Sequence, residues 1–260
     1  MIDRVSDSEA KEQAHFNHIA EKYFTKDLIH SSSIARQLRL KQTLKHARLQ
    51  KHHKILEVGC GGGFSASYLK GNYDQYLGID YSKKLIEYAN RYFNLSNTFF
   101  RTLNIKDLES DYNDFDMVLM IGVLHHMDDI EEVLLKIKTH LKPGGILVVN
   151  EPQPSNPLIT FSRRIRKKLD ATYSKEQKEL SAKELLNIFG STGYINIHSY
   201  PQGLSSTPFA EIPMKPQRLT TPLSLLACEF DSFLENYFPR YLTRLSWNLV
   251  LTGEKPAIPY

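Results

Sequence analysis

Between Lys54 and Glu151 the chain alternates short apolar segments with segments of helical periodicity, and this alternation restricts the folds it can adopt. The apolar segments predict strands at residues 54–59, 76–80, 98–103, 115–122 and 145–151. These strands are almost continuously apolar, which is typical of parallel strands buried on both faces. The pattern indicates an α/β domain in which helices cover both faces of a mostly parallel sheet.

The flanking segments complete this domain. Helical periodicity predicts helices at residues 8–24 and 33–50, before the first strand. After Glu151 the sequence predicts a further helix and strand within 181–200 and a closing strand at 247–253. We therefore predict one domain over residues 1–260, with a helical cap at 1–50, a ligand-binding core at 51–150 and insertions at 151–180 and 201–245.

Composition excludes several other classes of protein. Of the 260 residues, 41% are hydrophobic and only two are cysteine, which excludes a disordered chain and a disulfide scaffold. No apolar run approaches the roughly 20 residues of a membrane span. The first residues are charged and lack the apolar core of a signal peptide, so a cytoplasmic protein with free thiols is expected. Eleven of the 12 prolines follow residue 150, whereas nine of the 13 glycines precede it.

Two basic clusters bear on the binding partner. The net charge is only +4, but residues 28–56 contain seven Lys and Arg residues and no acid, and residues 163–168 contain five. Either cluster can attract an anionic lipid head group or a phosphorylated substrate. Either can equally be the solvated face of a helix. We expect no nucleic-acid partner.

The first strand runs directly into a glycine-rich turn, from Gly59 to Gly63. A dinucleotide-binding turn has the pattern G-x-G-x-x-G, but Phe64 occupies the sixth position here. Glu57 precedes the turn, and its carboxylate would repel a pyrophosphate while suiting an ammonium or sulfonium group. Asp80 ends the next strand, where a carboxylate can accept hydrogen bonds from both hydroxyls of a ribose. S-adenosylmethionine is a ligand that carries a ribose together with these cationic groups.

The ordered segments ILEVGCGGG, LGIDYS, FDMVLMIGVLHHMDD and LKPGGILVVNEP resemble the successive motifs of class I S-adenosylmethionine-dependent methyltransferases. The resemblance is to the branch that acts on small molecules, such as the ubiquinone and menaquinone C-methylases. It implies a Rossmann-like, seven-stranded, mostly parallel sheet with an antiparallel last strand, and lid insertions in the C-terminal half. The upstream FNHIAEKY and the closing WNLVLTGEKP are similar to the cap and last strand of that branch.

The resemblance also implies a set of cofactor-binding residues. Glu57, Gly59, Cys60 and Gly61 would hold the methionine portion, and Asp80 would bind the ribose. The remaining residues would surround the adenine or close the pocket; they are Tyr81, Asn104, Ile105, Ile121 and Tyr23. Asn104 replaces an aspartate that the family often has, and its side-chain oxygen can still accept a hydrogen bond.

Three residues at the carboxyl ends of the fourth and fifth strands are candidates for catalysis. His126, and less directly His125, can act as a general base or position the acceptor, because imidazole is partly neutral near pH 7. Glu151 is expected to face the acceptor side. No metal site is predicted, because adjacent residues of a turn point apart. Cys60 and Cys228 have no catalytic partner nearby in the sequence and are expected to be buried thiols.

We therefore predict methyl transfer from S-adenosylmethionine to a small, lipid-linked or anionic metabolite, leaving S-adenosylhomocysteine. The segment IGVLHH lacks the motif used to methylate nucleobase amines. An inert S-adenosylmethionine-binding regulator or partner subunit is the main alternative. An NAD-dependent oxidoreductase is a weaker one, since both Phe64 and Glu57 argue against it.

Overall fold

The structure is a computed structural model that describes residues 7–47, 53–154, 156 and 180–257. Its centre is a seven-stranded sheet in the order β3-β2-β1-β4-β5-β7-β6. The strands are β1 (His53–Val58), β2 (Tyr73–Asp80), β3 (Thr98–Thr102), β4 (Phe115–Ile121), β5 (Leu141–Pro152), β6 (Ile195–Gln202) and β7 (Asn248–Glu254). β1 to β5 pair in parallel, and β7 is antiparallel to both of its neighbours. The predicted fold class is confirmed.

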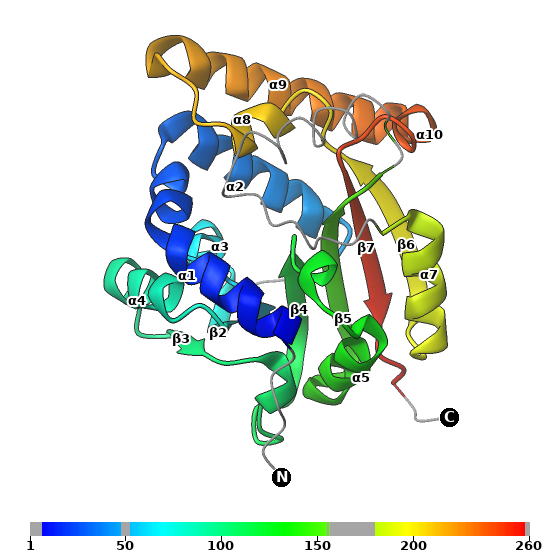
Figure 1. Cartoon of the computed structure of the whole chain (residues 1–260). Helices are drawn as coiled ribbons and strands as arrows, with labels where there is room; N and C mark the ends of the chain where they lie inside the picture. The colour runs from blue at the N-terminus through cyan, green and yellow to red at the C-terminus, as the bar shows by residue number, and fades with distance from the viewer. Residues whose placement is uncertain (1–6, 48–52, 155, 157–179, 258–260) are drawn as a thin grey trace.

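Helices surround the sheet and cover its upper edge in the view of Figure 1. They are α1 (Asp7–Asp27), α2 (His30–Lys45), α3 (Phe64–Tyr68), α4 (Lys83–Tyr92), α5 (Ile130–His140), α7 (Ala182–Ser191), α8 (Thr207–Glu211), α9 (Gln217–Tyr237) and α10 (Pro239–Leu242). Two short 3-10 turns, η1 (Ile105–Asp107) and η2 (Leu124–His126), follow β3 and β4. α1 packs on α4, and α2 packs beneath α8 and α9.

Local sequence signals start several of these helices. The Ser82 side chain accepts a hydrogen bond from the Leu85 amide and is the N-cap of α4. Ser181 and Glu184 form a reciprocal capping box at α7. Each cap satisfies amides that the helix itself leaves without an acceptor.

The apolar strands supply a core on each face of the sheet. In β1, Leu56 and Val58 belong to one buried cluster, whereas Ile55 belongs to the other. This alternation follows from the two-residue period of a strand. Glu57 is the one polar residue among the buried residues 55–58 of β1, and a buried carboxyl group requires partners.

Some boundaries differ from those predicted. α2 covers 30–45 instead of 33–50, and β5 begins at Leu141, ahead of the Pro143-Gly144-Gly145 turn signal. The proline-rich stretch after residue 201 completes β6 and then forms α8, α9 and α10, with Pro222 inside α9. The basic cluster at 163–168 lies outside the described residues.

Candidate cofactor and acceptor site

Strand register brings the predicted site residues to one edge of the sheet. Val58 at the end of β1 pairs with Ile79 of β2 and Met120 of β4. The next residue along each strand therefore lies at the same carboxyl edge, which puts Gly59 near Asp80. In open α/β sheets this edge is where ligands bind.

The glycine turn packs tightly against this edge of the sheet. The amides of Gly59 and Cys60 both donate to the Ile79 carbonyl, at 2.8 and 3.0 Å. Gly59 and Gly61 have φ values of +71° and +52°, which side-chain-bearing residues rarely adopt. A Cβ at Gly59 would overlap the Val123 side chain, whereas one at Gly61 would meet only the Tyr23 ring, at 3.7 Å. The turn thus needs glycine for both conformation and close packing.

Asp80 ties the glycine turn to the start of α4. One carboxylate oxygen accepts from the Gly61 amide at 2.9 Å, and the other accepts from the Ser82 amide at 2.8 Å. Burial raises the pKa of Asp80 to about 6, although these two amides oppose the shift. Each oxygen retains a lone pair, so the carboxylate can also accept bonds from a ligand's hydroxyl groups.

Glu57 lies behind the glycine turn and does not line the pocket. Its carboxylate accepts hydrogen bonds from the Ser65 hydroxyl at 2.7 Å and from the Tyr76 hydroxyl. Burial raises the pKa of Glu57 to about 7, partly offset by these two bonds. In this arrangement the side chain supports the start of α3, and contact with a cationic ligand through the carboxylate itself remains a prediction.

A pocket opens in front of Asp80, between the sheet edge and α1. Three of its side chains are acidic, and the rest are mostly apolar. The lining residues are Glu9, Glu12, Val58, Gly59, Ile79, Asp80, Tyr81, Leu103, Asn104, Ile105, Val123, His126, Met127 and Val133. The acidic groups give the pocket an electrostatic preference for a cationic ligand.

The structure brings five of the ten predicted cofactor residues together in this pocket. Gly59, Asp80, Tyr81, Asn104 and Ile105 all line it. The Asn104 side-chain oxygen also accepts from the Lys106 amide at 3.1 Å, so it caps η1 while facing the pocket. A carbonyl oxygen has two lone pairs, so it can accept a second hydrogen bond.

Three other predicted cofactor residues take different places. The Cys60 thiol packs in the core, where burial raises its pKa well above its ordinary value. Ile121 packs against the same core. Tyr23 of α1 lies over Gly61, and its ring makes an edge contact with Phe16. None of these side chains is among the pocket's lining residues.

The two histidines after β4 have different environments. His126 lines the pocket, and its Nδ1 lies 2.9 Å from a Glu12 carboxylate oxygen. Burial lowers the pKa of His126, against the opposing effect of Glu12. The His125 Nδ1 lies 2.6 Å from Glu151, away from the pocket lining.

Glu151 is fully buried beneath η2. One of its oxygens accepts from the amides of Val123 and Leu124, at 2.8 and 2.7 Å, and the other contacts His125. These bonds hold the turn that presents His126. The acceptor-facing role of Glu151 stays a prediction, and in this structure its carboxylate supports η2.

Sequence reasoning missed the polar side chains of α1 that complete the site. Gln13 donates to the Tyr81 carbonyl at 2.8 Å, and the Asn17 oxygen accepts from the Ser82 hydroxyl at 2.9 Å. Together with Glu9 and Glu12, these residues recur at helical spacing on α1. This spacing could have predicted that α1 contributes to the site, because polar residues on the inward face of a helix need partners.

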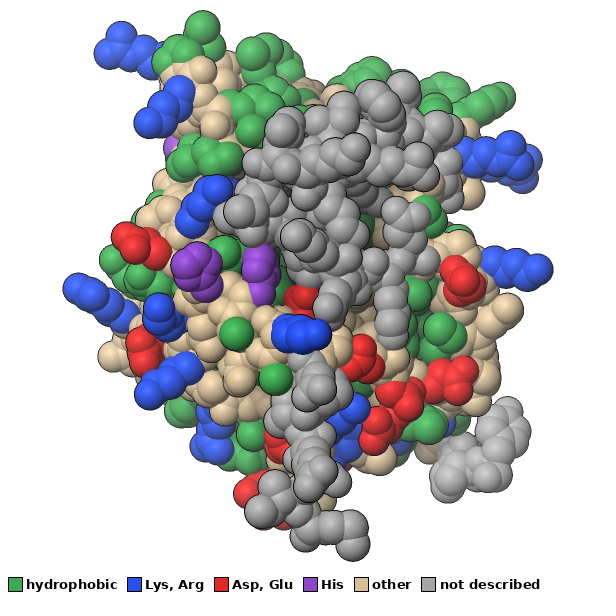
Figure 2. Space-filling view, in the orientation of Figure 1, with side chains coloured by type: hydrophobic (Ala, Val, Ile, Leu, Met, Phe, Trp, Pro, Cys, Tyr) green, Lys and Arg blue, Asp and Glu red, His purple; other side chains and the backbone are tan. Residues whose placement is uncertain are grey.

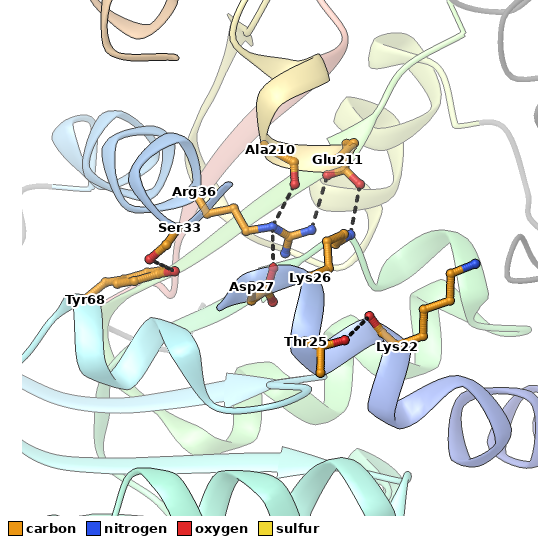
Figure 3. A network of polar contacts seen from close by, with 9 residues as sticks. All are labelled: Lys22, Thr25, Lys26, Asp27, Ser33, Arg36, Tyr68, Ala210 and Glu211. Atoms are coloured by element: carbon orange, nitrogen blue, oxygen red, sulfur yellow. Dashed lines mark hydrogen bonds and ion pairs between the residues drawn. The ribbon is translucent and has the colours of Figure 1, made fainter. Parts of the chain in front are cut away.

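A charged cluster joins the cap helices to α8 (Figure 3). The Arg36 guanidinium of α2 pairs with the buried Asp27 at 2.8 Å and donates to the Ala210 carbonyl at 3.0 Å. Glu211 pairs with both Arg36 and Lys26. The proximity of Asp27 and Glu211 keeps the pKa of Arg36 high despite burial. The cluster therefore fixes α1 and α2 against α8.

Within the described ranges, no helix is long and apolar enough to cross a membrane. The same residues hold no group of three His, Cys, Asp or Glu side chains arranged for a metal ion.

Comparison with known proteins agrees with this geometry. Residues 56–149 match the model of a methyltransferase domain family. The chain is 30% identical over 154 residues to the ubiquinone biosynthesis O-methyltransferase of Rickettsia akari, covering 56% of this chain and 61% of the relative. It is 30% identical over 119 residues to phthiotriol/phenolphthiotriol dimycocerosates methyltransferase 1 of Mycobacterium ulcerans, covering 45% of this chain and 44% of the relative.

A solved structure of a methyltransferase from Thermotoga maritima superimposes on 94% of this chain and 99% of its own, with a TM-score of 0.65 and 21% identity. The fold is that of the class I S-adenosylmethionine-dependent methyltransferases. Residues 56–149 match the methyltransferase domain family, and the predicted family resemblance is confirmed. The match spans about three fifths of the Rickettsia relative.

Proposed function

We propose that the chain transfers a methyl group from S-adenosylmethionine to a small acceptor molecule. The observation that carries this proposal is the placement of Asp80 beside the Gly59–Gly61 turn in one acidic pocket. The methyltransferase relatives support the same reaction class.

The residues present suit the cofactor. Gly59 and Gly61 leave backbone where a Cβ would stand, so a ligand can approach the turn closely. Asp80 offers acceptors for ribose hydroxyls, and Asn104 offers one for an adenine amine. Glu9 and Glu12 add negative charge that suits ammonium and sulfonium groups.

When bound, the cofactor supplies a methyl group that is already electrophilic, so the protein needs mainly to align the acceptor and exclude water. α1 covers the pocket and keeps water away, held to the core by Gln13 and Asn17. His126 has a pKa below its ordinary value and is therefore neutral at pH 7, so it can accept a proton from an acidic acceptor. Glu151 positions it through the backbone of η2.

The proposed acceptor is a small molecule that is lipid-linked or anionic. The name of one relative refers to the biosynthesis of ubiquinone, and the name of another refers to phthiotriol dimycocerosates. Both compounds are lipids. A cytoplasmic location and the absence of a nucleic-acid substrate belong to the same proposal. The exposed apolar side chains of α9, among them Leu226 and Phe230, support a lipid-linked acceptor.

A thermal-shift measurement tests cofactor binding. S-adenosylhomocysteine is expected to raise the Tm of the wild-type chain, and Asp80→Ala is expected to abolish the shift because both ribose acceptors are lost. Asp111→Ala, which removes an exposed carboxylate in the loop before β4, serves as the matched control and should keep the full shift. A wild-type shift that survives in Asp80→Ala would overturn the ribose assignment.

A transfer assay tests the reaction itself. The wild-type chain is incubated with methyl-labelled S-adenosylmethionine and a lipid-containing metabolite extract, and labelled products are identified by mass spectrometry. We expect one labelled product, which Asp80→Ala fails to form. Cofactor binding without any labelled product would favour the inert binding protein instead.

A further inference from the structure

The outer face of α9 and α10 is apolar and exposed. Along α9 the exposed residues Leu219, Leu223, Leu226, Phe230, Phe233 and Tyr237 follow one another at intervals of three or four positions. Beyond the end of α9, Tyr241 of α10 and Leu245 are exposed as well and are counted with this row. Residues at this spacing lie on one side of a helix. Leu226 is 62% exposed, Tyr237 71% and Tyr241 76%. We call this row the α9 apolar face.

The opposite side of α9 reverses the usual arrangement of a surface helix. Its buried residues include Thr220, Ser224 and Asp231. A surface helix normally buries its apolar side and exposes its polar side. Here the polar side is buried and hydrogen-bonded, so the exposed apolar row is not a by-product of packing. Contiguous apolar surface of this kind marks an interaction site.

The polar side of α9 is firmly held, so the apolar face is presented in a fixed direction. Asp231 accepts hydrogen bonds from the amides of Leu204 and Ser206, both at 2.8 Å. Ser224 donates to the Ser31 carbonyl of α2 at 2.9 Å. Figure 2 shows hydrophobic side chains along the upper border of the molecule, where Figure 1 places α9.

Charges at the ends of the face indicate the kind of partner. Between residues 212 and 245 the exposed basic residues are Lys215 and Arg218 at one end and Arg240 and Arg244 at the other. Glu229 is the one exposed acid in this interval. Aromatic and leucine side chains flanked by basic groups are the composition of helices that lie in the interface of an anionic membrane.

We propose that the α9 apolar face docks the protein on an anionic lipid bilayer, with α9 parallel to the surface. A second copy of the chain fits less well. Whether two such helices pair in the same or in opposite directions, a basic end of one meets a basic end of the other, and like charges repel. An anionic surface instead attracts both ends.

The position of α9 gives this docking a consequence for the substrate. α9 is held by the loop that follows the carboxyl end of β6, and α2 lies between α9 and the sheet. Docking would therefore turn the ligand-binding edge of the sheet toward the membrane. The inference concerns a surface away from Asp80 and goes beyond the proposed function, because binding to a bilayer needs neither cofactor nor acceptor.

Vesicle co-sedimentation tests the proposal with the full chain. Vesicles of phosphatidylcholine alone are compared with equal mixtures of phosphatidylcholine and phosphatidylglycerol, with no cofactor present. We expect the wild-type chain to bind the mixed vesicles, and Leu226→Glu/Phe230→Glu to weaken this binding by about tenfold or more. Arg240→Gln/Arg244→Gln is expected to weaken it by several-fold, and added salt should do the same.

Leu135→Glu is the matched control, since Leu135 is a helix residue of α5 that is 47% exposed and remote from the α9 apolar face. It should bind vesicles as the wild type does. Circular dichroism and the S-adenosylhomocysteine shift verify that each variant folds.

Three results would overturn the proposal. They are a wild-type chain that ignores anionic vesicles, a double variant that still binds them, and a loss of binding shared by Leu135→Glu. A vesicle-free dimer that Leu226→Glu/Phe230→Glu converts to a monomer, without any vesicle binding, would assign the face to a second copy. None of these outcomes depends on whether methyl transfer occurs.

Discussion

The glycine turn after β1 and the helix α9 differ in which side chains they bury and which they expose. Around the turn, the carboxylates of the buried Glu57 and the partly buried Asp80 accept hydrogen bonds from within the chain, and Gly59 is packed too closely against Val123 for a Cβ. On α9, buried polar groups hold the helix while leucine and phenylalanine face outward. The polar groups of the turn find their partners within the chain. The α9 apolar face has its proposed partner, a lipid bilayer, outside the chain.

A substitution in the turn is expected to have the largest effect. Gly59→Ala places a Cβ against Val123 at a positive φ, and we expect a loss of about 3 kcal/mol in the free energy of unfolding together with loss of cofactor binding. Denaturant titration and the S-adenosylhomocysteine shift measure both.

Gly71→Ala is the matched control for that variant. Its φ is +87°, but its Cβ would meet nothing within 4 Å, so only about 1 kcal/mol of conformational strain is expected. Equal losses in the two variants would show that packing against Val123 is unimportant, and the contrast between the two regions would weaken.

The joint between the two regions should give an intermediate effect. Arg36→Ala removes the Arg36–Asp27 ion pair and the Arg36 contacts with α8, and we expect a loss of about 2 kcal/mol. Chemical denaturation measures it. Lys142→Ala removes the more exposed pair with Asp116 and should cost less than about 1 kcal/mol. If the two losses were alike, the cap would not be fixed to α8 by this cluster.

The smallest effect is a change in pH dependence. Because the pKa of Glu57 rises from 4.5 to about 7 on folding, the folded chain holds a proton between these values that the unfolded chain has lost. The free energy of unfolding should therefore fall as pH rises through this window, by at most about 1.4 kcal/mol per pH unit from this one group.

Glu57→Gln should remove that contribution and flatten the fall between pH 4.5 and 7, measured by denaturation at several pH values. Glu184→Gln changes an exposed carboxyl whose pKa is lowered by the Ser181 cap, and it should leave the slope in this window unchanged. An unchanged slope in Glu57→Gln would mean that the carboxyl is already ionised at pH 5.

The sheet was largely predictable because it is built from local signals. Continuous apolar segments and a glycine-rich turn can be recognised in the sequence alone. Asp80 could be assigned to the carboxyl edge of the sheet because the end of its strand can be predicted from the length of the apolar segment. The partners of Glu57 could not be read, since Tyr76 approaches it only through the pairing of β1 with β2. Glu12 was missed for the same reason, since α1 and η2 are more than 100 residues apart.

α9 was harder to predict. Residues 201–245 were predicted only as an insertion, because α9 buries the side that helical periodicity would assign to solvent. Hydrophobic periodicity predicts the buried side of a helix correctly only when the apolar side chains face the interior. The charged cluster around Arg36 could not be predicted from the sequence, because its members come from three separate helices.

The position of β7 has a consequence for any attempt to study the cofactor half alone. β7 comes from the end of the described chain, yet it pairs with β5 over seven residue positions and separates it from β6. A fragment that stopped after β5 would expose a long apolar strand edge, which is a template for aggregation. The glycine-rich half thus depends on the proline-rich half to remain in solution, and the two should be expressed together.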